Sequence, residues 1–219
     1  MLSLRMLRPL ALAGALAASV AACSSSTNSS ILDKEPTIQF VGNSTCPTSG
    51  TSPYFTSSNG SVKPAPVNSL PAVGVPVDEM PHTHVQQGTQ IQYNHNPPTS
   101  GCHYNLGYGN APIQTGAYNT EIPPEYWVHN LEHGYIVVLY NCPSGCNTEF
   151  QALRSWYHNL SPDPNFGYPK VVILPYTQMT VPFACVSWDW YDPIPVFSIT
   201  EVQKFYANHV GNAAEPQGP

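Results

Sequence analysis

Apolar runs mark out short strands in the second half of the chain. Residues 135–140 and 170–176 are dominated by apolar, largely β-branched side chains, a pattern typical of strands buried on both faces. An aromatic-rich run over residues 183–191 predicts a third buried strand, and the alternation over residues 90–93 predicts a short one. The pattern therefore predicts a sheet assembled mainly from the part of the chain after residue 130.

Helical spacing occurs in three places around these strands. Residues 123–125, Pro-Pro-Glu, favour a first helical turn, and Gly134 stands where a left-handed residue would end that helix. Apolar residues over 147–160 recur with the period of an amphipathic helix. Ser198 has the capping position before a last helix over residues 199–209. The order strand, helix, strand, strand, helix predicts an α+β fold with helices on a mixed sheet.

The length of 219 residues suits one domain and an extension. The 24 prolines and 15 glycines predict a loop-rich domain with two or three short helices, which we place at residues 77–219. Residues 23–76 are rich in serine, threonine and proline and lack periodicity, so we expect a disordered tether there.

The N-terminus has the pattern of an export signal. Arg5 and Arg8 precede an apolar run over residues 9–22, which is too short for the ~20 residues of a membrane span. Cys23 follows Val-Ala-Ala directly and is similar to the acylated cysteine of a bacterial lipobox. We expect residues 1–22 to be a lipoprotein signal peptide. The mature protein would then be exported and held on a membrane, at the cell surface or in the periplasm, by lipid on Cys23.

The charge of the chain excludes one class of partner. Of the seven lysines and arginines, Arg5 and Arg8 lie in the signal, so the remainder carries five basic and thirteen acidic residues, a formal charge of −8. Nucleic-acid binding needs a basic footprint on phosphates, so we expect no nucleic-acid partner.

Histidines are concentrated in one region. Six of the eight lie within about fifty residues of each other: His82, His84, His95, His103, His129 and His133. His129 and His133 are four residues apart on the predicted helix and share a face, and Glu132 can join that face. Neutral imidazole is the commonest metal ligand and suits zinc and copper.

We therefore predict a transition-metal site, with zinc or copper as the ion. The expected ligands are four histidines: His84, His103, His129 and His133. Glu132 is expected to orient one of their rings from behind, and His82 and His95 are further candidates. The order His-x-x-Glu-His also matches an inverted zinc-protease motif, but Gly134 ends the helix at once, which argues against that chemistry. Storage, delivery and catalysis remain alternative roles.

Several stretches resemble a known family. Asp78 with His84-Val85, then Pro-Pro-Thr-Ser-Gly-Cys-His-Tyr over residues 97–104, Gly-Ala-Tyr over 116–118 and Val-His-Asn-Leu-Glu-His-Gly over 128–134 are similar to the bacterial domain-of-unknown-function family 3105. The resemblance covers roughly residues 77–190. It supports the grouping of the four histidines and implies no activity. Many members have proline where this chain has Cys102, so Cys102 is a ligand, half of a bridge or a replacement.

Cysteines supply a second hypothesis. Cys142 and Cys146 flank Pro-Ser-Gly between a predicted strand and a predicted helix, and an exported chain favours a disulfide between them. The same placement resembles the copper-delivery proteins of the thioredoxin superfamily, in which two thiolates at a helix N-terminus hold Cu(I). Three further cysteines remain: Cys46, Cys102 and Cys185. Because their number is odd, at least one thiol is left without a partner among them.

Aromatic residues supply a third hypothesis, a cell-surface binding module with no metal. Around the histidines lie Tyr104, Tyr108, Tyr118, Tyr126 and Trp127, and on the last predicted strand lie Trp188, Trp190 and Tyr191. They are either core residues or an exposed platform for a sugar or a protein.

Overall fold

The computed structural model describes residue 46 and residues 73–105 and 111–219. Its three helices are α1 (Pro124–Glu132), α2 (Asn147–His158) and α3 (Ile199–His209). Its longer strands are β5 (Ile136–Tyr140), β6 (Val171–Pro175), β7 (Phe183–Ser187) and β8 (Trp190–Ile194). Its two-residue strands are β1 (Val75–Pro76), β2 (His84–Val85), β3 (His103–Tyr104) and β4 (Gly116–Ala117). The protein is thus α+β, as the sequence pattern predicts.

Six strands form one mixed sheet in the order β1-β8-β7-β5-β6-β4. β5 and β6 are parallel and joined through α2, whereas β7 runs antiparallel to β5 and β8 antiparallel to β7. α3 follows β8, so the second half of the chain is a βαβ unit, a β-hairpin and a helix. β2 and β3 form a separate parallel pair.

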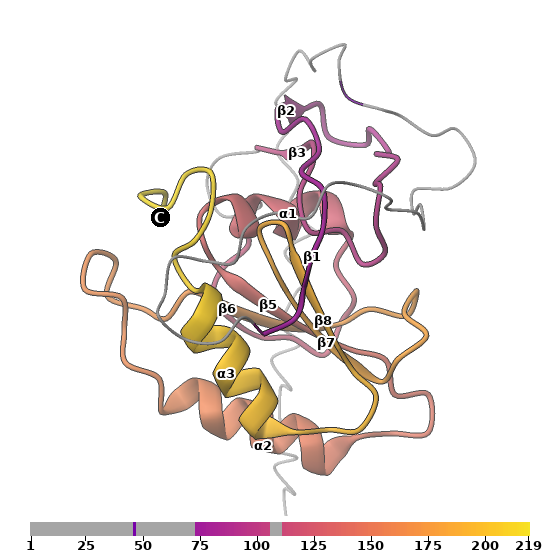
Figure 1. Ribbon diagram of the computed structural model, residues 1–219, viewed down its shortest axis with the longest axis vertical. Coiled ribbons are helices and arrows are strands. Elements are labelled where there is room, and N and C mark those ends of the chain that lie inside the picture. Colours follow the sequence, from indigo (N-terminus) through magenta and orange to yellow (C-terminus); the bar gives the residue numbers. More distant parts are fainter. Residues whose placement is uncertain (1–45, 47–72, 106–110) are drawn as a thin grey trace, which may run out of the picture.

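The helices cover both faces of the sheet, with α1 on one face and α2 and α3 on the other (Figure 1). Val137 and Leu139 of β5 belong to the core under α1, and Ile136 and Val138 belong to the core under α2 and α3. Because both faces are covered, β5 is apolar at every one of these positions, which is why the run was continuous in the sequence.

The predicted helix ends agree with the structure. α1 begins at Pro124 and is followed by Gly134 with a φ of +83°. The Ser198 side chain accepts a hydrogen bond from the Glu201 backbone N–H at the start of α3.

Two predicted strands need correction. Residues 183–191 form a hairpin rather than one strand: Ser187 pairs with Trp190 across a two-residue turn in which Asp189 has a φ of +63°. Asparagine-glycine or aspartate-glycine would have signalled such a turn, and this one has neither. Residues 90–93 form a single bridge at Ile91 and no strand beyond it, and the Ile91 N–H donates to the Glu125 carboxylate.

The domain was expected to begin at residue 77. The sheet begins slightly earlier, because β1 pairs with β8. The predicted signal peptide, Cys23 and most of the predicted tether lie outside the described residues. No helix in the described ranges is long and apolar enough to cross a bilayer.

Candidate metal centre

Three elements bring a group of potential ligands together. β2 and β3 pair in a register that sets His84 opposite His103, and α1 packs against β3 and contributes His129 and Glu132. One ligand atom from each of these four residues lies within 4.8 Å of the others. In a tetrahedral site with bonds of about 2.0–2.1 Å, ligand atoms stand about 3.4 Å apart, so closure on an ion needs only small side-chain shifts.

Main-chain oxygens fix the orientation of the two most buried rings. His103 Nδ1 lies 2.8 Å from the Gly101 carbonyl, and His129 Nδ1 lies 2.9 Å from the Tyr104 carbonyl. Each Nδ1 therefore carries the proton and donates it, which leaves Nε2 with a lone pair. Metal-binding histidines are held in this way.

The His103 Nε2 atom has no hydrogen-bond partner among the described residues, although the ring is fully buried. It lies 3.0 Å from Oε2 of Glu132. Two acceptor atoms at this distance repel each other unless a positive charge, either a proton or a metal ion, lies between them. The pair is therefore arranged for a cation.

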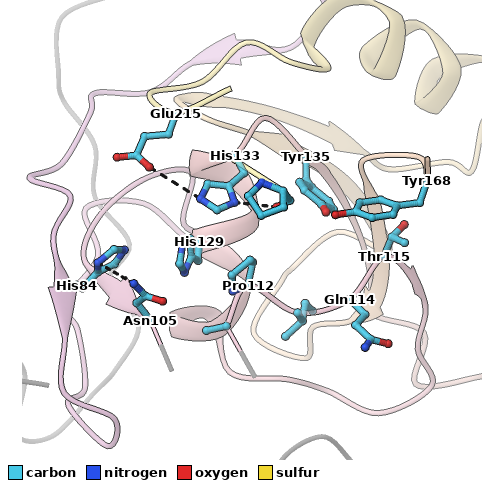
Figure 2. Close-up of a pocket in the computed structure, with 13 residues that line it drawn as sticks. His84, Asn105, Pro112, Gln114, Thr115, His129, His133, Tyr135, Tyr168 and Glu215 are labelled. Carbon is cyan, nitrogen blue, oxygen red and sulfur yellow. Dashed lines mark hydrogen bonds and ion pairs between the residues drawn. The ribbon is translucent and has the colours of Figure 1, made fainter. Parts of the chain in front are cut away.

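His84 completes the group from the solvent side. Its Nε2 lies 4.0 Å from Oε2 of Glu132, and its ring centroid is 5.1 Å from that of His103 and 5.0 Å from that of His129. Its Nδ1 contacts the Asn105 side-chain amide at 3.2 Å (Figure 2). If His84 held an ion through Nε2, Nδ1 would carry the proton and the Asn105 side-chain oxygen could accept it.

Glu132 is placed differently from the expectation that it orients a ring from behind. Its side chain is buried, and Oε2 is one of the four converging ligand atoms. The other oxygen, Oε1, lies 2.8 Å from His82 Nδ1, so His82 occupies the position of the outer residue that orients the carboxylate. His82 in turn packs edge-on against Trp188.

His133 and His95 lie apart from the group of four. The His133 ring is 4.5 Å from that of His129, but His133 Nε2 converges with Glu132 and Glu215, not with His84 and His103. His95 bonds the Pro97 carbonyl and packs on Tyr191, away from the cluster.

Protonation states in the cluster follow from burial. Burial, reinforced by the surrounding imidazoles, lowers the pKa of His129 to about 2, and burial also lowers the pKa of His84 and of His133. Burial alone would favour the protonated carboxyl. When a proton, not an ion, lies between His103 Nε2 and Glu132, the hydrogen bond and charge of His103, together with the hydrogen bond from His82, outweigh burial and lower the pKa of Glu132 to about 2. His84, His129 and His133 are then neutral imidazoles, and Glu132 is a carboxylate. These are the forms that bind metals.

A pocket of about 750 Å³ opens beside the cluster. Figure 2 shows His84, His129 and His133 on one side of it and Tyr135 and Tyr168 on the other. An ion held by the cluster would therefore be reachable by a ligand of small-molecule size.

The cysteines resolve into two disulfides and a thiol. Cys102 bonds Cys46 and is thus half of a bridge, and Cys142 bonds Cys146. Cys185 is a free, buried thiol on β7. The Cys142–Cys146 pair lies at the start of α2 and packs on the core of the opposite face of the sheet from α1.

Most of the aromatic residues considered as a platform are core residues instead. Five are buried: Tyr104, Tyr126, Trp127, Trp188 and Trp190. Tyr118 and Tyr191 are half-buried and pack against the core under α1, and Tyr108 lies outside the described residues. His209, near the end of the chain, is also fully buried, against Trp190 and Phe205.

Two residues near the site escaped sequence reasoning. Asn130 accepts the Ile113 N–H at 2.9 Å and donates to the Ile113 carbonyl at 2.8 Å, which fixes a wall of the pocket to α1. Glu215 approaches from the C-terminal segment. The position of Asn130 inside His-Asn-Leu-Glu-His was a signal that could have indicated its role. No local pattern marks Glu215.

The fold and the site define an α+β protein with a histidine–glutamate cluster beside a pocket. The chain belongs to the family described as a protein of unknown function (DUF3105), which matches residues 84–219, more than half of the sequence. The match extends past residue 190, where the resemblance was expected to end, and it includes Glu215. No curated protein and no solved structure matches the chain.

Proposed function

We propose that this protein binds a transition-metal ion through His84, His103, His129 and Glu132. The observation that carries the proposal is the buried contact between His103 Nε2 and the Glu132 carboxylate, two acceptor atoms 3.0 Å apart, with His129 and His84 converging on the same point. Three imidazoles and one carboxylate suit zinc or copper(II). The pocket beside them gives a small ligand access to the ion.

Metal analysis of the purified full chain tests this proposal. We expect at least one zinc or copper ion per chain after loading and desalting. His103→Ala is expected to remove the ion held by these four residues, and His158→Ala, which removes an exposed histidine at the end of α2, is expected to leave the metal content unchanged. Absence of bound metal after loading with zinc and with copper would contradict the proposal and favour a binding module without metal.

We further propose that the protein works outside the cytoplasm, anchored by lipid on Cys23. The lipobox-like sequence supports this placement, and the Cys46–Cys102 and Cys142–Cys146 disulfides suit an oxidising compartment. Cys23→Ala is expected to move the protein from the membrane fraction to the soluble exported fraction. An unchanged distribution would contradict the anchor.

A second candidate function, thioredoxin-like redox or copper delivery, is favoured by one observation. β5, α2 and β6 form a βαβ unit, the β7–β8 hairpin and α3 follow, and a disulfide lies at the N-terminus of α2, which is the connectivity that this alternative requires. Equilibration with glutathione buffers, followed by alkylation and mass spectrometry, tests it. A midpoint above about −250 mV supports exchange, and one below about −300 mV indicates a structural bridge.

A further inference from the structure

A second set of metal-binding side chains shares one residue with the first. Glu132, His133 and Glu215 each offer a ligand atom, and these atoms lie within 4.8 Å of one another. Glu132 belongs to both sets, and the rings of His129 and His133 stand 4.5 Å apart. Two ligand groups joined through one carboxylate are the arrangement of a carboxylate-bridged pair of metal ions, in which the ions lie about 3.5–4 Å apart.

His133 has the same orientation as the buried rings of the first group. Its Nδ1 donates to the main-chain oxygen of Pro219 at 2.9 Å, so Nε2 has the lone pair. That Nε2 faces Oε2 of Glu215 at 4.0 Å (Figure 2). His133 as a residue is only 6% exposed, and its Nε2 is an acceptor at the edge of the pocket, aimed at a carboxylate.

The segment that carries Glu215 is fixed to the site by several contacts. The Glu215 N–H donates to the Glu132 carbonyl at 2.8 Å. Lys170 Nζ donates to the carbonyls of His133, Pro216 and Gly218 at 2.8–2.9 Å. Gly218 packs so closely on the His133 ring that a Cβ there would collide with it. Glu215 is therefore positioned by the fold, although its side chain remains open to the pocket.

From these contacts we propose that the protein holds two divalent transition-metal ions, with Glu132 as the bridging carboxylate. This inference rests on the proposed function, because the first ion lies among His84, His103, His129 and Glu132. The second ion lies between His133 and Glu215, at the edge of the pocket. Each carboxylate oxygen has more than one acceptor site, so Glu132 can bind both ions and keep its hydrogen bond from His82.

Cobalt(II) titration of the metal-free full chain, followed by absorbance and by metal analysis after desalting, tests the pair. We expect two equivalents in the wild type. Glu215→Gln is expected to weaken the second equivalent at least about ten-fold and to leave the first within about three-fold. Glu149→Gln on α2, the same change on the opposite face of the sheet, is expected to retain both.

The outcomes separate the two proposals. One equivalent in the wild type, unaffected by Glu215→Gln, would overturn the second position and leave the first standing. Two equivalents in Glu215→Gln, both with wild-type affinity, would also overturn it, because the second ion would then lie elsewhere. No bound cobalt would contradict both. Loss of electron paramagnetic resonance intensity when a second equivalent of copper(II) is added would support a bridge, since bridged copper spins couple.

Discussion

Lys170 shows how one side chain can organise a site through main-chain contacts alone, without touching the ligand side chains. It is 1% exposed, and its ammonium group replaces water with three main-chain carbonyls, one on His133 and two in the C-terminal segment. It also lies 4.3 Å from the centre of the Phe166 ring. The charge is tolerated inside because all three ammonium protons have acceptors.

Lys170→Met removes these bonds while keeping most of the volume. We expect the free energy of unfolding to fall by about 2–4 kcal/mol, because one buried and two half-buried carbonyls lose their donor. Hydrogen exchange of residues 212–219 should accelerate, since the C-terminal segment is no longer held. Urea denaturation and exchange mass spectrometry measure the two effects, and Lys204→Met on the exposed face of α3 is the control. Equal stability of the two variants would contradict the role of Lys170.

Asp192 makes stability depend on pH at a place far from the cluster. Burial, together with the charge of Glu201, raises the pKa of Asp192 to about 6. In the unfolded chain the value is about 3.9, so between the two values the folded state holds a proton that the unfolded state has released. The free energy of unfolding therefore decreases as the pH rises from about 4 to about 6, and the full loss applies above 6.

Asp192→Asn removes this dependence. Relative to the wild type, the variant should gain on the order of 2–3 kcal/mol of unfolding free energy between pH 4 and pH 7. Urea denaturation at both values measures the difference. A difference between the two proteins that is the same at pH 4 and pH 7 would contradict the effect of burial.

At the scale of elements, the junction of α1 and β5 sets the position of the site. α1 ends at Glu132, Gly134 reverses the chain, and β5 begins at Ile136. The Gly134 carbonyl also accepts the Gly211 N–H at 2.9 Å, so the same turn receives the end of α3. The ligand-bearing end of α1 is therefore tied to the sheet and to the C-terminal segment at one point.

Gly134→Ala tests this junction. A Cβ there would lie 2.8 Å from the Gly211 Cα, and the φ of +83° disfavours alanine by about 1–2 kcal/mol. We expect a loss of more than about 2 kcal/mol in thermal or urea unfolding. Gly88→Ala is a matched control with a φ of +85° and no atom within 4 Å of the added Cβ. If both variants lose the same stability, the contact with Gly211 contributes nothing.

Elements with strong local patterns were predictable from sequence. Each of these elements has an apolar pattern set by its own residues: β5, β6, α2 and α3. The strands are apolar throughout because both faces of the sheet are covered, and the helices are apolar on the face that packs on the sheet. The β7–β8 hairpin was missed because Asp189 adopts its positive φ without a glycine signal. The strand expected around Ile91 is a single bridge, and a glutamate from α1 accepts the Ile91 N–H.

The site was predictable only in part, for a similar reason. Helical spacing grouped His129, Glu132 and His133, and the fold brings His84 and His103 to the first two. Tertiary packing decides which of the two ligand groups each residue near the end of α1 joins. Spacing along the helix could therefore not assign Glu132 and His133 to their groups. Glu215 approaches through contacts with the Glu132 and His133 backbones that no sequence period records.

At the scale of the whole molecule, the sheet separates two chemistries. α1 covers one face of the sheet, and α2 and α3 cover the other (Figure 1). The histidine cluster includes His129 and Glu132 of α1, and the Cys142–Cys146 disulfide packs against the core under α2 and α3. Nothing in the described chain links the two by a direct hydrogen bond or ion pair between those side chains. The two sites should therefore respond independently to substitution.

The double variant Cys142→Ser with Cys146→Ser tests this independence. We expect unchanged metal content and a loss of about 2 kcal/mol in unfolding free energy, the amount that the chain-entropy model gives for so short a loop. Metal analysis and urea denaturation on the same preparation measure both. Loss of metal in the double variant would favour copper delivery through the thiols instead.

The close approach of Gly218 and Pro219 to His133 has a practical consequence for recombinant work. Any peptide fused after Pro219 would emerge beside the imidazole that the final residues now cover. A polyhistidine purification tag at that position would place additional imidazoles next to Glu215, where they would compete with His133 for a metal ion. Protein for metal titration is better purified without an appendage there.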